Sequence, residues 1–90
     1  MKIFIWSQGI ELLHTAPNYP NAWAIVIADN LMRARELLNE ACKKNYDENS
    51  SYYERIVNLP DYEYILQSVY EWEKVIIFTN TGCCQLNKKI

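Results

Sequence analysis

Apolar residues along this chain gather in short blocks, and three of these blocks alternate as expected for strands with two apolar faces. The three blocks span residues 2–7, 22–28 and 74–79. In the second block the side chains at positions 23, 25 and 27 are large, whereas those at 24, 26 and 28 are alanine or valine. Because small residues allow close packing, this pattern predicts a helix on the alanine side of the strand.

The segment that follows the second block has the spacing of an amphipathic helix. Its apolar stripe consists of Leu31, Ala34, Leu37, Leu38 and Ala41. Asp29 or Asn30 can accept hydrogen bonds from the first free N–H groups of such a helix. Lysines at 43 and 44 complement the helix dipole at the other end. We therefore predict a helix that runs to about Lys44.

The remaining segments carry weaker patterns. Residues 52–59 alternate but include charged side chains, which predicts an exposed edge strand. Pro60 and Asp61 suit the first turn of a helix, and the apolar spacing that continues to Val69 predicts a short second helix. Residues 83–90 are expected to form either a short extra strand or a frayed tail.

These elements predict an α+β fold in one domain that spans residues 1–90. The simplest arrangement is a two-layer sandwich with a four-stranded mixed sheet, two helices and the order β-β-α-β-α-β. The first two strands are expected to pair antiparallel. Because both helices would lie on one face, the opposite apolar face would be exposed, and a homodimer mate is a candidate to cover it.

Charge and hydropathy narrow the classes of partner. The chain has 90 residues, and its nine basic and eleven acidic residues are interleaved and give a net charge of −2. Direct binding to nucleic acid is disfavoured, because phosphate neutralisation by a basic surface supplies most of that affinity. The chain has no 18-residue apolar run and its N-terminus lacks a signal-peptide pattern, so we expect a cytoplasmic protein with no membrane partner.

Residues with catalytic or metal-binding chemistry are few. Cys83 and Cys84 are adjacent and follow a glycine turn, which permits a redox or soft-metal role, but three cysteines with one histidine do not match paired zinc knuckles. His14 has no nucleophile signature around it. Phosphate-binding, zinc-protease and calcium-loop motifs are absent from the sequence. We expect a non-enzymatic protein with no catalytic residue, no metal site and no cofactor.

Aromatic residues are the most informative feature of the composition. Seven tyrosines and three tryptophans are many for this length, and such side chains dominate binding hot spots. Phe4, Trp23 and Phe78 are expected to fill the core. The candidates for a protein interface are Tyr19, Tyr46, Tyr52, Tyr64, Tyr70 and Trp72. The loop at 8–21, which contains two prolines, is a further candidate contact segment.

Four segments together resemble small uncharacterised phage- and prophage-type α+β proteins. They are Met-Lys-Ile-Phe-Ile-Trp at the start, Ala-Trp-Ala-Ile-Val-Ile-Ala at 22–28, Ala-Arg-Glu-Leu-Leu at 34–38 and Val-Ile-Ile-Phe-Thr-Asn-Thr-Gly-Cys-Cys at 75–84. The resemblance carries no catalytic motif. It implies an inhibitor that binds and blocks a bacterial host factor, such as a CRISPR-like defence component.

Three hypotheses follow from the sequence. The first is a binding module that occupies the surface of a protein partner. The second is a homodimeric binder or sponge for a nucleotide-like ligand, with Arg33, Arg35 or Arg55 on its phosphate and a tyrosine on its base. The third is a thiol redox protein that uses Cys83 and Cys84.

Overall fold

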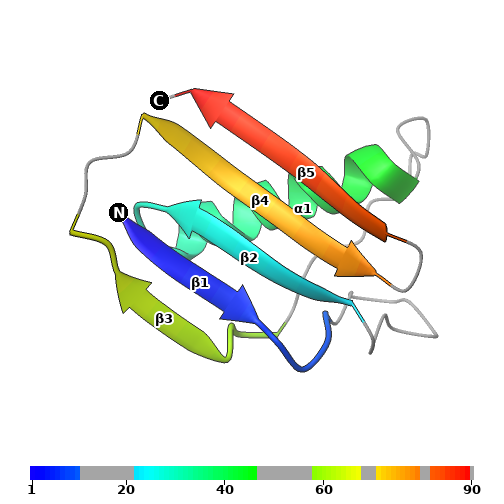
Figure 1. Cartoon of the computed structure of the whole chain (residues 1–90), viewed down its shortest axis with the longest axis horizontal. Coiled ribbons are helices and arrows are strands. Elements are labelled where there is room, and N and C mark those ends of the chain that lie inside the picture. Colours follow the sequence, from blue (N-terminus) through cyan, green and yellow to red (C-terminus); the bar gives the residue numbers. More distant parts are fainter. Residues whose placement is uncertain (11–21, 47–57, 68–70, 80–81, 90) are drawn as a thin grey trace.

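A computed structural model describes residues 1–10, 22–46, 58–67, 71–79 and 82–89 of the chain. Within these ranges it contains one helix and a five-stranded sheet, in the order β-β-α-β-β-β (Figure 1). The elements are β1 (Lys2–Trp6), β2 (Trp23–Ala28), α1 (Leu31–Tyr46), β3 (Tyr62–Ile65), β4 (Trp72–Thr79) and β5 (Gly82–Lys89). The fold is therefore α+β, as predicted.

The strands lie in the order β3-β1-β2-β4-β5, and every neighbouring pair is antiparallel. The predicted strands at 2–7, 22–28 and 74–79 are confirmed, as is the antiparallel pairing of the first two. The predicted four-stranded mixed sheet is wrong. β2 and β3 run in the same direction, but β1 lies between them. They are therefore not hydrogen-bonded neighbours and do not form the expected parallel pair.

The predicted second helix is wrong, because its described part forms β3. Tyr62 and Tyr64 pair with Ile5 and Ile3 of β1, and the Asp61 N–H donates to the Ile5 carbonyl at 2.7 Å. A helix over this segment would place Ile65 on its apolar face against the core, but Ile65 is 77% exposed. The free edge of β1 offers this segment a ladder of backbone hydrogen bonds, which outweighs its weak helical pattern.

Two other sequence predictions have different outcomes. Residues 52–57 of the predicted third strand lie outside the described residues, and Asn58 and Leu59 are irregular. The alternative of an extra strand near the C-terminus is correct, since Gly82–Lys89 forms β5 along β4. That strand replaces the predicted frayed tail over its described length.

The core lies between α1 and one face of the sheet. Asn30 caps the helix, because its side-chain oxygen accepts from the Arg33 N–H at 2.9 Å. As predicted, the small face of β2 lies beneath the helix, and Ala24, Val26 and Ala28 are fully buried. The core residues are Phe4, Trp6, Ile10, Ala22, Ala24, Val26, Ala28, Ala34, Leu37, Leu38, Ala41, Val75 and Ile77.

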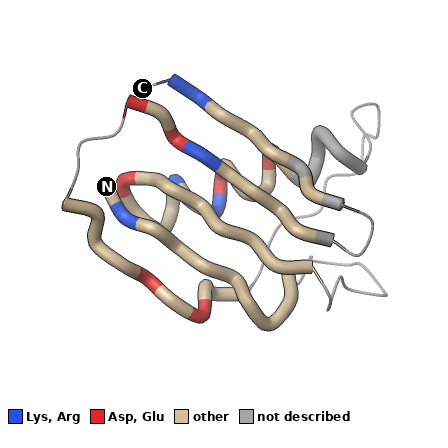
Figure 2. Tube along the Cα trace, in the orientation of Figure 1, with Lys and Arg blue, Asp and Glu red and all other residues tan. Residues whose placement is uncertain are grey.

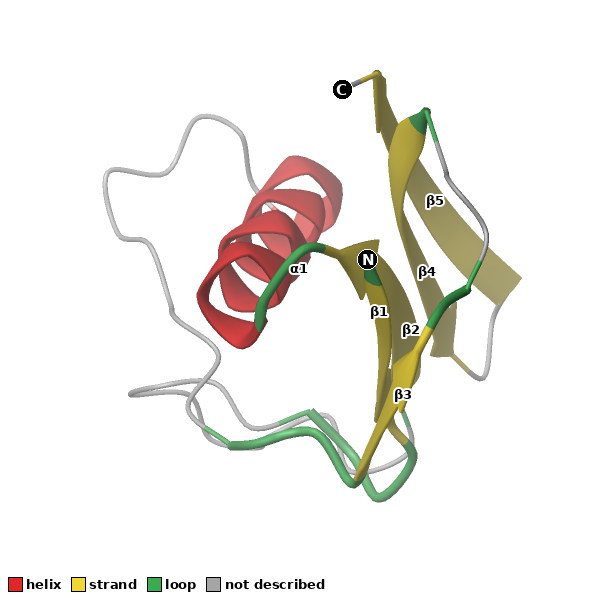
Figure 3. Ribbon diagram, turned by 90° about the vertical axis from the view of Figure 1, so that its left-hand side faces the viewer, coloured by secondary structure: helices red, strands yellow, loops and turns green. Residues whose placement is uncertain are grey.

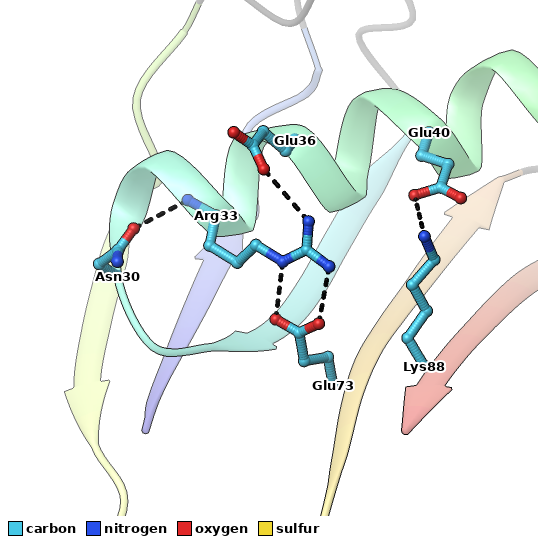
Figure 4. Close-up of polar contacts among 6 residues, drawn as sticks. All are labelled: Asn30, Arg33, Glu36, Glu40, Glu73 and Lys88. Carbon is cyan, nitrogen blue, oxygen red and sulfur yellow. Dashed lines mark hydrogen bonds and ion pairs between the residues drawn. The ribbon is translucent and has the colours of Figure 1, made fainter. Parts of the chain in front are cut away.

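Ion pairs join the helix to the far half of the sheet (Figure 4). The Arg33 guanidinium donates to both carboxylate oxygens of the buried Glu73, at 2.9 and 2.8 Å, and also to Glu36 at 3.1 Å. These hydrogen bonds hold the pKa of Glu73 below its usual value and raise that of Arg33. Lys88 of β5 pairs with Glu40 at 2.7 Å. The two contacts connect α1 to the last two strands.

In the other half of the sheet, the carboxylate of Asp61 joins the residues after β1 to the start of β3. Asp61 accepts hydrogen bonds from the backbone N–H groups of Ser7 and Gln8 and from the Ser7 hydroxyl, at 2.6, 3.0 and 3.2 Å. The bond from the Ser7 N–H is the largest cause of the lowered pKa of Asp61. Asp61 therefore joins the end of β1 to the start of β3, which is a role in loop anchoring rather than in a helix cap.

We expect the Glu73→Gln substitution to lower the free energy of unfolding by about 1–3 kcal/mol at neutral pH, because it weakens a buried charged pair. The folded-state pKa of Glu73 lies below its ordinary value of 4.5. Its stabilisation is therefore complete above that pH and is lost as the pH falls through the folded-state pKa. Urea unfolding at pH 7 and at pH 3 measures the loss of stability and its dependence on pH. An equal loss at the two pH values would contradict the assignment.

We expect Asp61→Ala to speed hydrogen exchange at the Ser7 and Gln8 amides, since both lose their acceptor. The matched control is Asp29→Ala, which removes another exposed aspartate just before α1. Exchange followed by NMR distinguishes the two variants. Unchanged protection at both amides in Asp61→Ala would show that this carboxylate does not anchor the turn.

Candidate protein-binding face

The face of the sheet opposite α1 carries no described element (Figure 3). We call it the open face. Its residues alternate with those of the core along every strand. They are Ile3 and Ile5 of β1; Trp23, Ile25 and Ile27 of β2; Tyr62 and Tyr64 of β3; Trp72, Lys74, Ile76 and Phe78 of β4; and Cys83, Gln85, Asn87 and Lys89 of β5.

The strand register arranges these residues in rows that cross the sheet. One row runs Tyr64, Ile3, Ile27, Lys74 and Asn87 from β3 to β5. The next row runs Tyr62, Ile5, Ile25, Ile76 and Gln85. The centre of the open face is therefore aliphatic, its β3 edge is aromatic and its β5 edge is polar. Such a contiguous apolar surface is typical of an interaction site.

Aromatic rings stand on this surface in stacked pairs. Trp23 and Phe78 face each other across β2 and β4, with ring centroids 4.1 Å apart and planes at 13°. Tyr62 and Tyr64 stack along β3 at 6.4 Å. The prediction that Trp23 and Phe78 fill the core is wrong, since Trp23 is 39% exposed and both lie on the open face. Their odd or even positions, not their size, decide the face on which they lie.

The charge of the open face is of one sign. Lys74 and Lys89 are its charged residues, and both lie toward the same corner. The ion pairs described above, and that of Lys2 with Glu63, involve residues of the helix or of the helix side of the sheet. Figure 2 shows no charge along the middle of β1 and β2. The centre of the open face therefore offers a partner apolar contact with no charge to desolvate.

A shallow hollow of about 270 Å³ lies at the basic corner. Among the described residues it is lined by Trp72, Lys74 and Asn87. It combines an indole ring with an ammonium group and an amide, so it can receive an aromatic or polar side chain.

Two of the interface candidates chosen from the sequence, Tyr64 and Trp72, lie on the open face, on β3 and β4, and are 53% and 44% exposed. Tyr46 ends α1, but its side chain is outside the described part of the structure. Tyr19, Tyr52 and Tyr70, and the loop at 8–21 beyond Ile10, also lie outside it. Tyr62 and Trp23 also lie on the open face, although neither was predicted from the sequence as an interface residue.

For Trp23, the sequence did contain a pattern that indicates a place on the open face. The alternation at 22–28 places it on the face opposite the alanines, which is the face that a single helix layer leaves open. Tyr62 had no comparable signal, because the helical spacing around it suggested a different element. Its place on the open face follows only from its pairing with Ile5.

The residues of the two alternative hypotheses do not converge on a site in the described structure. Arg33 donates hydrogen bonds to Glu73 and Glu36, so a phosphate group could bind Arg33 only by displacing these carboxylates. Arg35 lies partly buried on α1, and Arg55 is outside the described ranges. Cys83 is a free, exposed thiol on the open face, and the side chain of Cys84 is not described.

Metal-binding residues do not cluster within the described part of the chain, where no three His, Cys, Asp or Glu side chains come together. His14 lies outside it. None of the described helices is long and apolar enough to span a membrane.

Comparison with known protein families, curated proteins and solved structures finds no match to this chain.

We expect truncations on the open face to cost less stability than truncations in the core. Phe4→Ala should lower the free energy of unfolding by about 3–5 kcal/mol, because Phe4 is fully buried. Tyr64→Ser should lower it by about 1 kcal/mol or less, because half of that side chain is already in water. Thermal and urea unfolding at low protein concentration measure the difference. Equal losses would mean that the open face is part of the folding core.

Proposed function

We propose that this chain is a small non-enzymatic binding module that acts by covering the surface of a protein partner. The observation that carries the proposal is the open face. Large apolar side chains from β1 to β4 line it, and no described residue packs over them. Leaving such a surface in water is costly, so its burial against a partner supplies the driving force for binding.

The chemistry of the face favours a protein as the partner. Trp23, Tyr62, Tyr64 and Trp72 offer large contact area with little loss of side-chain entropy, and each retains a polar group that can bond across an interface. A phosphate backbone would need a basic groove, but the described basic residues of the open face are Lys74 and Lys89, at one corner.

The resemblance to phage-type proteins suggests where to look for the partner. It favours a bacterial host factor, with CRISPR-like defence components as the first class to test. In that setting the module would inhibit by occupying a surface that the host factor needs, so no catalytic residue is required of it.

The test compares matched variants as baits in a bacterial lysate. The double variant Tyr64→Ser, Trp72→Ser removes two open-face aromatics, and Met32→Ser removes a 74% exposed side chain of α1 instead. We expect the native chain and Met32→Ser to retain the same protein. The double variant should retain it more than tenfold less well, because each hot-spot residue contributes about 2 kcal/mol or more.

Quantitative mass spectrometry of the retained proteins reads out this comparison, and thermal unfolding checks that each bait is folded. If the double variant retained every protein as well as the native chain, the open face would not be the binding surface. If only Met32→Ser lost the partner, the outer side of α1 would take that role.

A further inference from the structure

We propose that the open face is covered, when no other partner is bound, by the open face of a second copy of this chain. This inference rests on the proposed function in using the same surface, and it names the occupant. The two copies are related by a twofold axis that lies between the sheets and runs parallel to β2. The product is a sandwich of two five-stranded sheets with a helix on each outer side.

Such an axis reverses the order of the strands in the facing sheet. β2 then lies over β2 of the second copy, β1 lies over β4, and β3 lies over β5. The rows of the open face stay in step, because rotation about an axis parallel to the strands preserves position along them. Two sheets packed in this way keep their strands within about 30° of each other, as in aligned β-sandwiches.

The contacts that result match in chemistry. Ile25 meets itself at the axis, and Ile5 meets Ile76, so the aliphatic centre is buried against its own kind. At the two edges, Tyr62 lies over Gln85 and Tyr64 lies over Asn87. Phenol hydroxyl groups thus face side-chain amides, which can both donate to and accept from them.

Charge selects this arrangement over the other face-to-face one. A twofold axis perpendicular to the strands would place β4 over β4 and β5 over β5, so that Lys74 and Lys89 of both copies gather at one edge without a described acid. The axis parallel to β2 moves the two basic corners to opposite edges. There Lys74 lies over Ile3 of the second copy and one strand away from its Tyr64, whose ring can receive the ammonium in a cation–π contact.

The size of the face is sufficient for a weak dimer. Five strands about 4.8 Å apart and six residues at about 3.4 Å give a footprint of about 480 Å². Two such footprints come to about 1,000 Å², which is the lower limit for a specific interface. The relief of the four exposed aromatic rings adds to this area. A dissociation constant in the micromolar range is therefore expected.

The first test measures mass against concentration. Sedimentation equilibrium from about 1 to 200 µM should show the native chain passing from its monomer mass of 10.7 kDa to twice that value. Ile25→Glu places two like charges together at the axis and should leave only monomer. Met32→Glu, on the outer side of α1, should dimerise as the native chain does. A native chain that stays monomeric, or a dimer that tolerates Ile25→Glu, overturns the proposal.

The second test remains valid if Ile25→Glu fails to fold, because it uses exposed positions at the two edges of the sheet. β3 and β5 are the outermost strands, so positions 62 and 85 can interact only between copies. Tyr62→Lys and Gln85→Glu should each weaken the dimer. A chain that carries both substitutions should dimerise about tenfold more tightly than the sum of their separate effects predicts.

An absence of this coupling would overturn the arrangement about the axis parallel to β2. The experiments also separate this inference from the proposed function. If the native chain is monomeric but loses its lysate partner in the Tyr64→Ser, Trp72→Ser variant, the dimer is wrong and the binding module stands. If the dimer forms as described and no partner depends on the open face, the proposed function is wrong.

Discussion

One helix can cover only one face of a sheet, and the rest of this structure follows from that constraint. α1 lies over β2, β4 and β5, and the alanines of β2 allow its close approach. Every strand residue that points the other way must find another environment. Those residues include isoleucines, tryptophans and tyrosines, so the described part of the sheet carries an apolar surface on the face opposite α1. The second helix expected from the sequence would not have covered this surface, because it would have lain on the same side as α1.

The polar contacts are arranged around the same constraint. The bonds from Arg33 to Glu73 and from Lys88 to Glu40 join the helix to β4 and β5. Asp61 connects the residues that follow β1 to the start of β3. These contacts lie on the helix side of the sheet or at the ends of its strands. Among the described residues, none of the charged groups lies at the centre of the open face, so the proposed partner would meet little desolvation cost there.

The core and the surface proposed for binding therefore lie on opposite faces of each strand. Phe4 and Val26 serve the core, whereas Ile5 and Ile25, one position away, serve the open face. Under the proposed function, a change of residue on the open face alters partner preference at little cost to the fold. This separation suits the binding module proposed above, and it also suits the proposed pairing with a second copy.

The sequence by itself determined the central strands, the helix and which side chains of β1, β2 and β4 share a face. These features follow from local periodicity, which a single segment carries within itself. It did not determine that 62–65 forms a strand, because its helical spacing was outweighed by the free edge of β1. Nor did it place Trp23 and Tyr64 on one surface. Only the tertiary structure decided these points, because strand pairing joins segments that are distant in the chain.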